Sequence, residues 1–265
     1  MIKVNSLLIC LLLSFYSFTL EASAKRIIST SPVITEFISF LGQSKNLVAV
    51  SNYCKNKQGL PTIGSSFGLD YEQIVSLNSD ILFLESVNDT RVKEKLKKLN
   101  INNVELKFLT IRDIKESSFK IAKNLGLTRE KLYELFYQLK PLGNTGKKVL
   151  IVLGEDTNSN FIKTIRAVSG NSFYSNILGL VGGINILHNS SVSYPILDLE
   201  KLMSLSPDII IRIGQNTSSD KVKKIWAKTI FKDKVRFMMD DTYLIPGPQI
   251  LKTYTKMRDI VREAK

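Results

Sequence analysis

The chain has few of the residue types that build metal and catalytic centres. Its 265 residues include one histidine, two cysteines and one tryptophan. Zinc and manganese sites in proteins use clusters of histidines and carboxylates, and His188 stands alone, so we expect no bound metal ion. The sequence also lacks a Ser-His-Asp arrangement, a G-x-S-x-G motif and a phosphate-cradling glycine loop. We therefore expect neither enzyme activity nor a cofactor.

The shortage of cysteine also limits how the chain is stabilised. Cys10 lies in an apolar N-terminal run, which leaves Cys54 as the only cysteine in the rest of the chain. A single cysteine excludes an intramolecular disulfide, so packing has to stabilise the fold. Lipid attachment at Cys10 requires a small residue before it, and the residue there is Ile9. We therefore expect no lipid anchor.

The N-terminus has the three regions of a secretory signal peptide. Lys3 supplies positive charge, residues 7–13 are apolar, and Ala22-Ser23-Ala24 offers small residues for cleavage. An uncleaved membrane anchor is the alternative, but a spanning helix needs roughly 20 apolar residues and this run is shorter. We predict a signal peptide over residues 1–24, cleaved near Ala24. An exported chain without a lipid anchor indicates a Gram-negative periplasm.

The chain has 24 acidic residues against 37 lysines and arginines, which gives a net charge of +13. The basic residues form mild clusters at 93–98 and 221–228, where apolar residues recur at helical spacing. Such clusters can bind nucleic acid or anionic lipid. The apolar spacing favours solvated helix faces instead, and export removes nucleic acid as a partner. An anionic ligand is compatible with this charge.

Short apolar runs alternate with longer amphipathic stretches along the first half of the chain. Ser31-Pro32 opens a helix as cap and first helical residue, and Gly42 lies just beyond its end. Further helices are predicted at 71–77, 91–99 and 111–125. Strands are predicted at 26–29, 47–50, 81–84 and 103–108. Alternation of this kind indicates an α/β fold with a mostly parallel sheet between helices.

A second series of elements follows a helical stretch at 128–139. Strands are predicted at 148–153, 209–213 and 235–238, and helices at 172–180, 199–205 and 249–263. Pro141, Gly143 and Gly146 separate the two series. We therefore predict an N-terminal lobe over 25–125, a linker helix over 126–146 and a C-terminal lobe over 147–265.

An internal repeat supports two lobes of similar topology. Residues 69–80 and 197–208 both read L-D-x-E-x-h-h-S-L-x-x-D, where h is apolar, and both precede a predicted strand. The copies lie about half the mature chain apart. Chance similarity between two helix-to-strand turns is the alternative.

These segments resemble the class III periplasmic binding proteins of ABC importers, which carry cobalamin, haem and ferric siderophores. The resemblance covers nearly the whole mature chain. It rests on the opening Arg26-Ile27-Ile28-Ser29-Thr30-Ser31-Pro32 with Thr35-Glu36, on the paired repeat, on Gly182-Gly183-Ile184-Asn185, and on Pro246-Gly247-Pro248 before the last helix. It implies two Rossmann-like lobes joined by a helix, with the ligand in the cleft between them.

The resemblance assigns docking roles to Glu72 and Glu200, one in each repeat. In the family, an acidic residue on each lobe meets arginines of the permease dimer in the inner membrane. Two separated carboxylates on a rigid body also favour correct orientation at encounter. The alternative is that each glutamate only complements the dipole of its helix. That alternative does not account for the same offset in both copies.

The resemblance also suggests aromatic ligand contacts at Tyr53, Tyr194 and Phe67. Large, flat ligands are held by stacking and area burial, although aromatic side chains in loops also serve in packing. His188 is a weak candidate for an axial metal ligand, against a plain surface histidine. Cys54 is either a metal contact or a buried inert thiol.

The expected ligand is a metal chelate, and Gln249 favours cobalamin among the three. Many haem and siderophore binders carry arginine after the Gly-Pro turn, so glutamine there lacks a cationic anchor for an anionic chelate. Haem and ferric siderophore remain the alternatives, with an exported enzyme on the same fold as a third. We expect the protein to act as a monomer.

Overall fold

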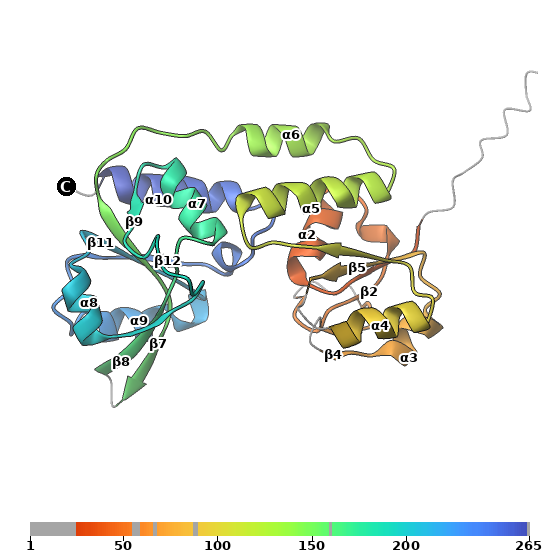
Figure 1. Ribbon diagram of the computed structural model, residues 1–265, viewed down its shortest axis with the longest axis horizontal. Helices are drawn as coiled ribbons and strands as arrows, with labels where there is room; N and C mark the ends of the chain where they lie inside the picture. Colours follow the sequence, from red (N-terminus) through yellow and green to blue (C-terminus); the bar gives the residue numbers. More distant parts are fainter. Residues whose placement is uncertain (1–24, 55–58, 66–67, 87–89, 159–160, 264–265) are drawn as a thin grey trace, which may run out of the picture.

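The structure is a computed structural model that describes residues 25–54, 59–65, 68–86, 90–158 and 161–263. The predicted signal peptide and Phe67 lie outside the described residues. Among the described helices, none has the length and apolar character needed to cross a membrane. Figure 1 shows two α/β lobes side by side, with helices lying across both of them.

The N-terminal lobe is built on a four-stranded parallel sheet with the order β2-β1-β5-β6. Its strands are β1 (Ile27–Ser29), β2 (Leu47–Val50), β5 (Ile81–Glu85) and β6 (Asn103–Leu106). The central strands read as continuous apolar runs because both faces of the sheet are covered. Ile27 and Phe83 belong to one core cluster, and Ile28 and Leu82 belong to another on the opposite face.

Helices on the two sides of this sheet complete a three-layer lobe. Its helices are α2 (Pro32–Phe40), α3 (Tyr71–Ser76) and α4 (Thr90–Lys98), with a 3₁₀ turn η1 (Ser44–Asn46) and a small hairpin of β3 (Gly64–Ser65) and β4 (Gly68–Leu69). Phe37 of α2 packs into the first cluster, while Ile74 of α3 and Leu96 of α4 pack into the second. The predicted α/β fold and these helices are therefore confirmed.

The C-terminal lobe has a six-stranded mixed sheet. Five of its strands follow the order β10-β8-β7-β11-β12, and the sixth, β9, pairs with β7. Its strands are β7 (Lys148–Asn158), β8 (Phe161–Ala167), β9 (Ile184–Asn185), β10 (Ile196–Asp198), β11 (Ile209–Gly214) and β12 (Val235–Met239). Its helices are α7 (Phe173–Leu180), α8 (Leu199–Leu205), α9 (Ser219–Trp226) and α10 (Ile250–Glu263), with 3₁₀ turns η2 (Asn216–Ser218) and η3 (Asp241–Leu244). The predicted strand at 148–153 ends too early, because β7 continues into an antiparallel hairpin with β8.

Two antiparallel helices bridge the lobes along one side of the molecule (Figure 1). These are α5 (Ile111–Asn124) and α6 (Glu130–Tyr137). The start of α5 is attached to α7, because the Ile111 amide donates to Asn176 Oδ1 at 3.0 Å and the Phe173 amide donates to the Leu109 carbonyl at 2.6 Å. One hydrophobic cluster runs through α2, α5, α7 and α10. The lobes therefore share a continuous core.

Of the predicted linker helix over 126–146, only Glu130–Tyr137 is helical. The segment from 138 to 147 runs without helix to β7, and Pro141 within it lacks the amide hydrogen that a helix would need. Two bonds attach this segment to the end of α7: the Leu142 amide donates to the Leu180 carbonyl at 2.6 Å, and the Thr145 amide to the Gly182 carbonyl at 2.8 Å. The lobe boundaries themselves stay a prediction.

Candidate functional site

Two cavities lie where the lobes meet. The larger, about 680 Å³, lies at the carboxyl ends of β5 and β6 and is bordered on its other side by residues of the C-terminal lobe. It is lined by Glu85, Ser86, Lys107, Phe108, Leu109, Asp113, Leu153, Phe173, Tyr174, Tyr194, Leu244 and Pro246. Parallel α/β sheets bind ligands beyond the carboxyl ends of their strands, and this cavity has that position.

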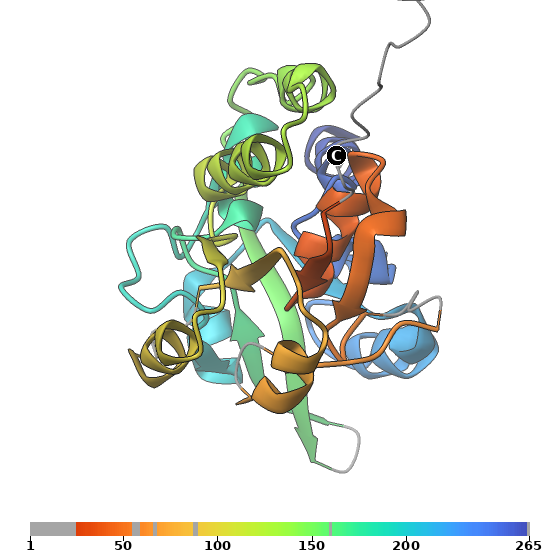
Figure 2. The same cartoon turned by 90° about the vertical axis from the view of Figure 1, so that its right-hand side faces the viewer.

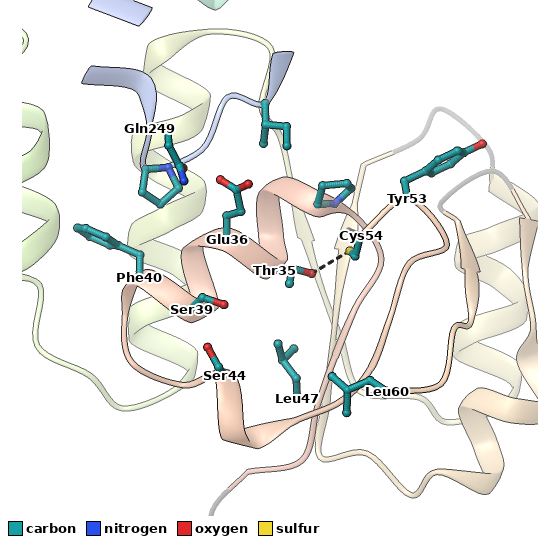
Figure 3. A pocket seen from close by; sticks show the side chains of 13 residues that line it. Thr35, Glu36, Ser39, Phe40, Ser44, Leu47, Tyr53, Cys54, Leu60 and Gln249 are labelled. Atoms are coloured by element: carbon teal, nitrogen blue, oxygen red, sulfur yellow. Dashed lines mark hydrogen bonds between the residues drawn. The ribbon is translucent and has the colours of Figure 1, made fainter. Parts of the chain in front are cut away.

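The smaller cavity, about 490 Å³, lies along α2 and beyond the end of β2 (Figure 3). It is lined by Pro32, Thr35, Glu36, Ser39, Phe40, Ser44, Leu47, Tyr53, Cys54, Leu60, Ile245, Pro248 and Gln249. The segment from 244 to 249 takes part in both cavities, since Leu244 and Pro246 line the larger and Ile245 and Gln249 line the smaller. The turn before α10 therefore lies between the two spaces.

Tyrosines form one wall of the larger cavity. Tyr174 is buried and its hydroxyl donates to the Tyr243 carbonyl at 2.7 Å. Burial raises the pKa of the Tyr174 phenol, and the neighbouring Tyr194 raises it further. Burial also raises the pKa of Tyr194, although 39% of that residue remains exposed. Tyr194 is therefore partly buried and still presents a surface that a ligand can contact.

A carboxylate, Glu85, lies at the floor of the same cavity. It ends β5, and burial raises the pKa of its carboxyl above the ordinary value of 4.5. Lys107 is the only basic residue among the described residues that line either cavity. Asp113 is already engaged, because it completes the capping box of α5 by accepting from the amide of the N-cap residue Thr110 at 2.9 Å. The lining is thus aromatic and polar, with little positive charge.

Glu36 of α2 and Gln249 of the turn before α10 both line the smaller cavity (Figure 3). Within the described part of the chain, Glu36 Oε2 and Gln249 Oε1 are both buried without a hydrogen-bond partner. Burial raises the pKa of Glu36, with Lys252 opposing the shift. A Cβ atom at Gly247 would come 2.8 Å from Glu36 Oε2, so a larger residue there would make the Glu36 side chain shift.

The predicted aromatic contacts fall on different cavities. Tyr53 follows β2, is 69% exposed and lines the smaller cavity, whereas Tyr194 lines the larger one. The structure therefore places both at the lobe junction without bringing them together, and their ligand role stays a prediction. Phe67 belongs to the segment that is not described.

Cys54 and His188 have partners within the protein. Cys54 is buried, and its Sγ lies 3.2 Å from Thr35 Oγ1. His188 is at the surface with Nδ1 2.9 Å from the Asn185 carbonyl oxygen, and it is not among the described residues that line the two cavities. No group of three or more metal-ligating side chains occurs in the described residues.

The sequence repeat is also a structural repeat. Asp70 caps α3 by accepting from the Gln73 amide at 3.0 Å, and Asp198 caps α8 by accepting from the Lys201 amide at 2.7 Å. The aspartate at the end of each copy then accepts from the first strand of its own sheet. Asp80 Oδ2 binds the Arg26 amide at 2.6 Å, and Asp208 Oδ2 binds the Lys148 amide at 2.7 Å. The two copies therefore make the same local hydrogen bonds in both lobes.

Glu72 and Glu200 occupy equivalent places in this repeat. Each is exposed and lies in the first turn of its helix, two residues after the capping aspartate. Both carboxylates are therefore available to a partner. Their position is also favourable for the helix dipole, so geometry alone leaves docking as a prediction.

Several cavity residues were not predicted. Phe108, Lys107 and Tyr174 have no motif of their own, and Glu36 was noted only as part of the opening segment. One signal was available for Lys107 and for Glu85, which was not predicted either. Glu85 ends a buried parallel strand and Lys107 directly follows another, and such positions lie at the ligand edge of an α/β sheet.

Two α/β lobes with a shared core and cavities at their junction define a two-lobed ligand-binding protein. The chain belongs to the periplasmic binding protein family, because the sequence profile of that family matches residues 27–233. The predicted membership is therefore confirmed. This is a family of binding proteins rather than enzymes.

Named relatives are similar over most of their length. A vitamin B12-binding protein of Photorhabdus laumondii subsp. laumondii is 26% identical over 255 residues, covering 91% of this chain and 89% of the relative. The periplasmic vitamin B12 binding protein of Vibrio cholerae superposes with a TM-score of 0.69 at 22% identity, covering 91% of this chain and 98% of the other. The periplasmic heme binding protein of the same organism gives 0.70 at 20% identity, covering 91% and 99%.

Proposed function

We propose that this protein is exported to the periplasm, binds a corrinoid such as cobalamin between its lobes and delivers it to the permease dimer of an ABC importer. The relatives named as vitamin B12-binding proteins support the ligand class. The observation that carries the choice is the lining of the cavities. It is rich in aromatic residues and contains a single lysine among its described residues.

That lining suits a large ligand with little negative charge. Tyr194 offers exposed ring area for a macrocycle, and the buried rings of Phe173 and Phe108 border the same cavity. Haem carries two propionates, and ferric catecholate siderophores are strongly anionic, so both gain from clustered cationic donors. Here Glu85 and Glu36 add carboxylates where such ligands would need positive charge. A neutral or weakly charged corrinoid avoids that conflict.

Titration of the chain from Lys25 with cyanocobalamin, haemin and a ferric catecholate tests the proposal. Absorbance and calorimetry should show the tightest binding for cyanocobalamin, without turnover, together with a rise in thermal stability that depends on ligand concentration.

Tyr194→Ala should weaken binding by about tenfold or more, because a stacking surface for the ligand is lost. Tyr133→Ala, which removes an exposed tyrosine of α6 outside both cavities, is the control. Tighter binding of haemin or the siderophore would refute the corrinoid assignment. No binding of any of the three ligands would refute the whole proposal.

A further inference from the structure

An exposed apolar groove of about 220 Å³ lies on the C-terminal lobe between β8, α8 and the end of α9. Phe161, Met203 and Ile230 line it, and they are 68%, 55% and 73% exposed. Single exposed apolar residues are ordinary, whereas several around one groove mark a surface that meets a partner. Its floor includes Ile162 and Phe231, which belong to the core of the lobe.

Lysines border this groove. Lys228 lines it directly, and Lys221, Lys224 and Lys228 line the neighbouring hollow on α9. All three are exposed, and none takes part in an ion pair within the described part of the chain. The nearby acidic groups are Asp220 on α9, Asp233 before β12, and Glu200 beside Leu199 on α8, so positive charge predominates.

The other lysine cluster behaves differently, although its sequence is similar. On α4, Lys93 Nζ pairs with Glu105 at 2.7 Å and Lys95 Nζ lies 4.2 Å from the centre of the Tyr71 ring. These two lysines bind groups of the protein itself. Only the cluster on α9 combines uncompensated lysines with an adjacent apolar groove.

We propose that this basic-apolar surface, formed by Phe161, Met203 and Ile230 with Lys221, Lys224 and Lys228, binds an anionic phospholipid bilayer. The apolar side chains would enter the boundary between headgroups and acyl chains, and the ammonium groups would meet lipid phosphates. Three lysines near an anionic membrane surface favour a weak, reversible association that salt weakens.

The shape of the lobe favours such a contact. Figures 1 and 2 both show the β7–β8 hairpin projecting beyond the rest of the C-terminal lobe, and Phe161 is the first residue of β8. A side chain at a projecting edge can reach a flat surface without displacing either lobe. Association with the membrane would also raise the local concentration of the protein near any membrane-bound partner.

Sedimentation with vesicles of about 30% phosphatidylglycerol in phosphatidylcholine, against phosphatidylcholine alone, tests the inference on the chain from Lys25. The apolar leader is then absent and cannot contribute. We expect binding to the anionic vesicles that weakens as salt is added. Lys224→Glu with Lys228→Glu should reduce the partition coefficient by at least about tenfold. Phe161→Ser with Ile230→Ser should reduce it as well, because apolar burial is lost.

Matched controls separate this surface from net charge and general hydrophobicity. Lys97→Glu with Lys98→Glu makes the same charge change in the last turn of α4, and Tyr137→Ser with Val192→Ser removes two other exposed apolar side chains. Both controls should bind vesicles nearly as wild type does. Absence of binding, equal loss in the controls, or binding only to vesicles that contain a permease would overturn the proposal. Ligand binding by all these variants should be unchanged, so failure here is distinguishable from failure of the corrinoid assignment.

Discussion

At the scale of single residues, the junction between the lobes contains polar groups that the fold leaves incompletely satisfied. Glu36 Oε2 and Gln249 Oε1 are both buried in the lining of the smaller cavity, and neither has a hydrogen-bond partner among the described residues. A buried carboxylate oxygen without a donor disfavours the ionised form of the group. Burial correspondingly raises the pKa of Glu36. The uptake of a proton by Glu36 would remove this buried charge.

This arrangement predicts a pH-dependent effect of Glu36→Gln on stability. The folded protein holds the Glu36 proton more tightly than the unfolded chain, whose ordinary pKa is 4.5, so wild-type stability falls as the pH rises above that value. The amide of glutamine stays neutral, so its burial leaves no charge without a partner. We expect the variant to be more stable than wild type by about 1 kcal/mol near neutral pH, with a smaller difference below the ordinary pKa.

Urea unfolding at several pH values measures this difference. Glu134→Gln, at an exposed position on α6, is the control and should give curves parallel to wild type. A gain for Glu36→Gln that is the same at acidic and neutral pH would contradict the explanation by titration.

At the scale of secondary-structure elements, the repeated helix-to-strand unit is the most regular feature of the chain. In both lobes an aspartate caps the helix, and a second aspartate ten residues later binds the amide that precedes or begins the first strand of the sheet. The serine near the helix end is repeated too: Ser76 Oγ donates to the Gln73 carbonyl and Ser204 Oγ to the Lys201 carbonyl, both at 2.8 Å. Similar local sequence has produced the same local hydrogen bonds twice.

Equivalent caps should have similar energies. Asp70→Ala and Asp198→Ala each remove one side-chain acceptor for a helical amide, and each should lower the free energy of unfolding by about 1 kcal/mol. Chemical denaturation of the two variants measures the effect. Asp220→Ala, which removes an exposed carboxylate from the first turn of α9 without removing a capping bond, should cost less. A loss at one aspartate only would show that the two units are not energetically equivalent.

At the scale of the whole molecule, the two repeats place one exposed glutamate on each lobe. The lobes share a core through α2, α5, α7 and α10, so the distance between Glu72 and Glu200 is held by packing rather than by a flexible linker. A rigid pair of carboxylates can match a pair of cationic sites on a symmetric permease dimer. The shared core also favours limited movement of the lobes on ligand binding.

The docking role predicts that Glu72→Lys with Glu200→Lys abolishes import while ligand affinity stays within about twofold of wild type, because the glutamates line neither cavity. Uptake by cells and calorimetry on the purified variant measure the two effects. Glu94→Lys with Glu134→Lys gives the same change in net charge at other exposed positions and should leave import intact. Normal import by the Glu72 and Glu200 variant would refute docking, and a loss of stability without loss of import would support the helix-dipole explanation.

Much of the fold was predictable from local pattern. The buried parallel strands β1, β2, β5 and β11 are mostly apolar in sequence, and Ser31 and Ser172 are the residues that directly precede α2 and α7. Ser172 accepts a hydrogen bond from the Ser175 amide, whereas the Ser31 side chain makes no capping bond, so the predicted side-chain cap is wrong there. The hairpin was missed because β8 alternates exposed and buried residues and includes Lys163 and Arg166, so it has no continuous apolar run. Its stability comes from pairing with β7, a contact that a single segment does not reveal.

The sequence by itself determined the α/β class, the two equivalent capped units around Glu72 and Glu200, and the family, because each depends on spacing within a short stretch of chain. Only the tertiary structure decided how Glu85, Lys107 and Tyr194 come to line one cavity and Glu36, Tyr53 and Gln249 another. It also separated the lysines of α4, which bind within the protein, from those of α9, which border an open apolar groove. These distinctions depend on contacts between residues far apart in the chain, and such contacts arise only when the sheets and helices pack.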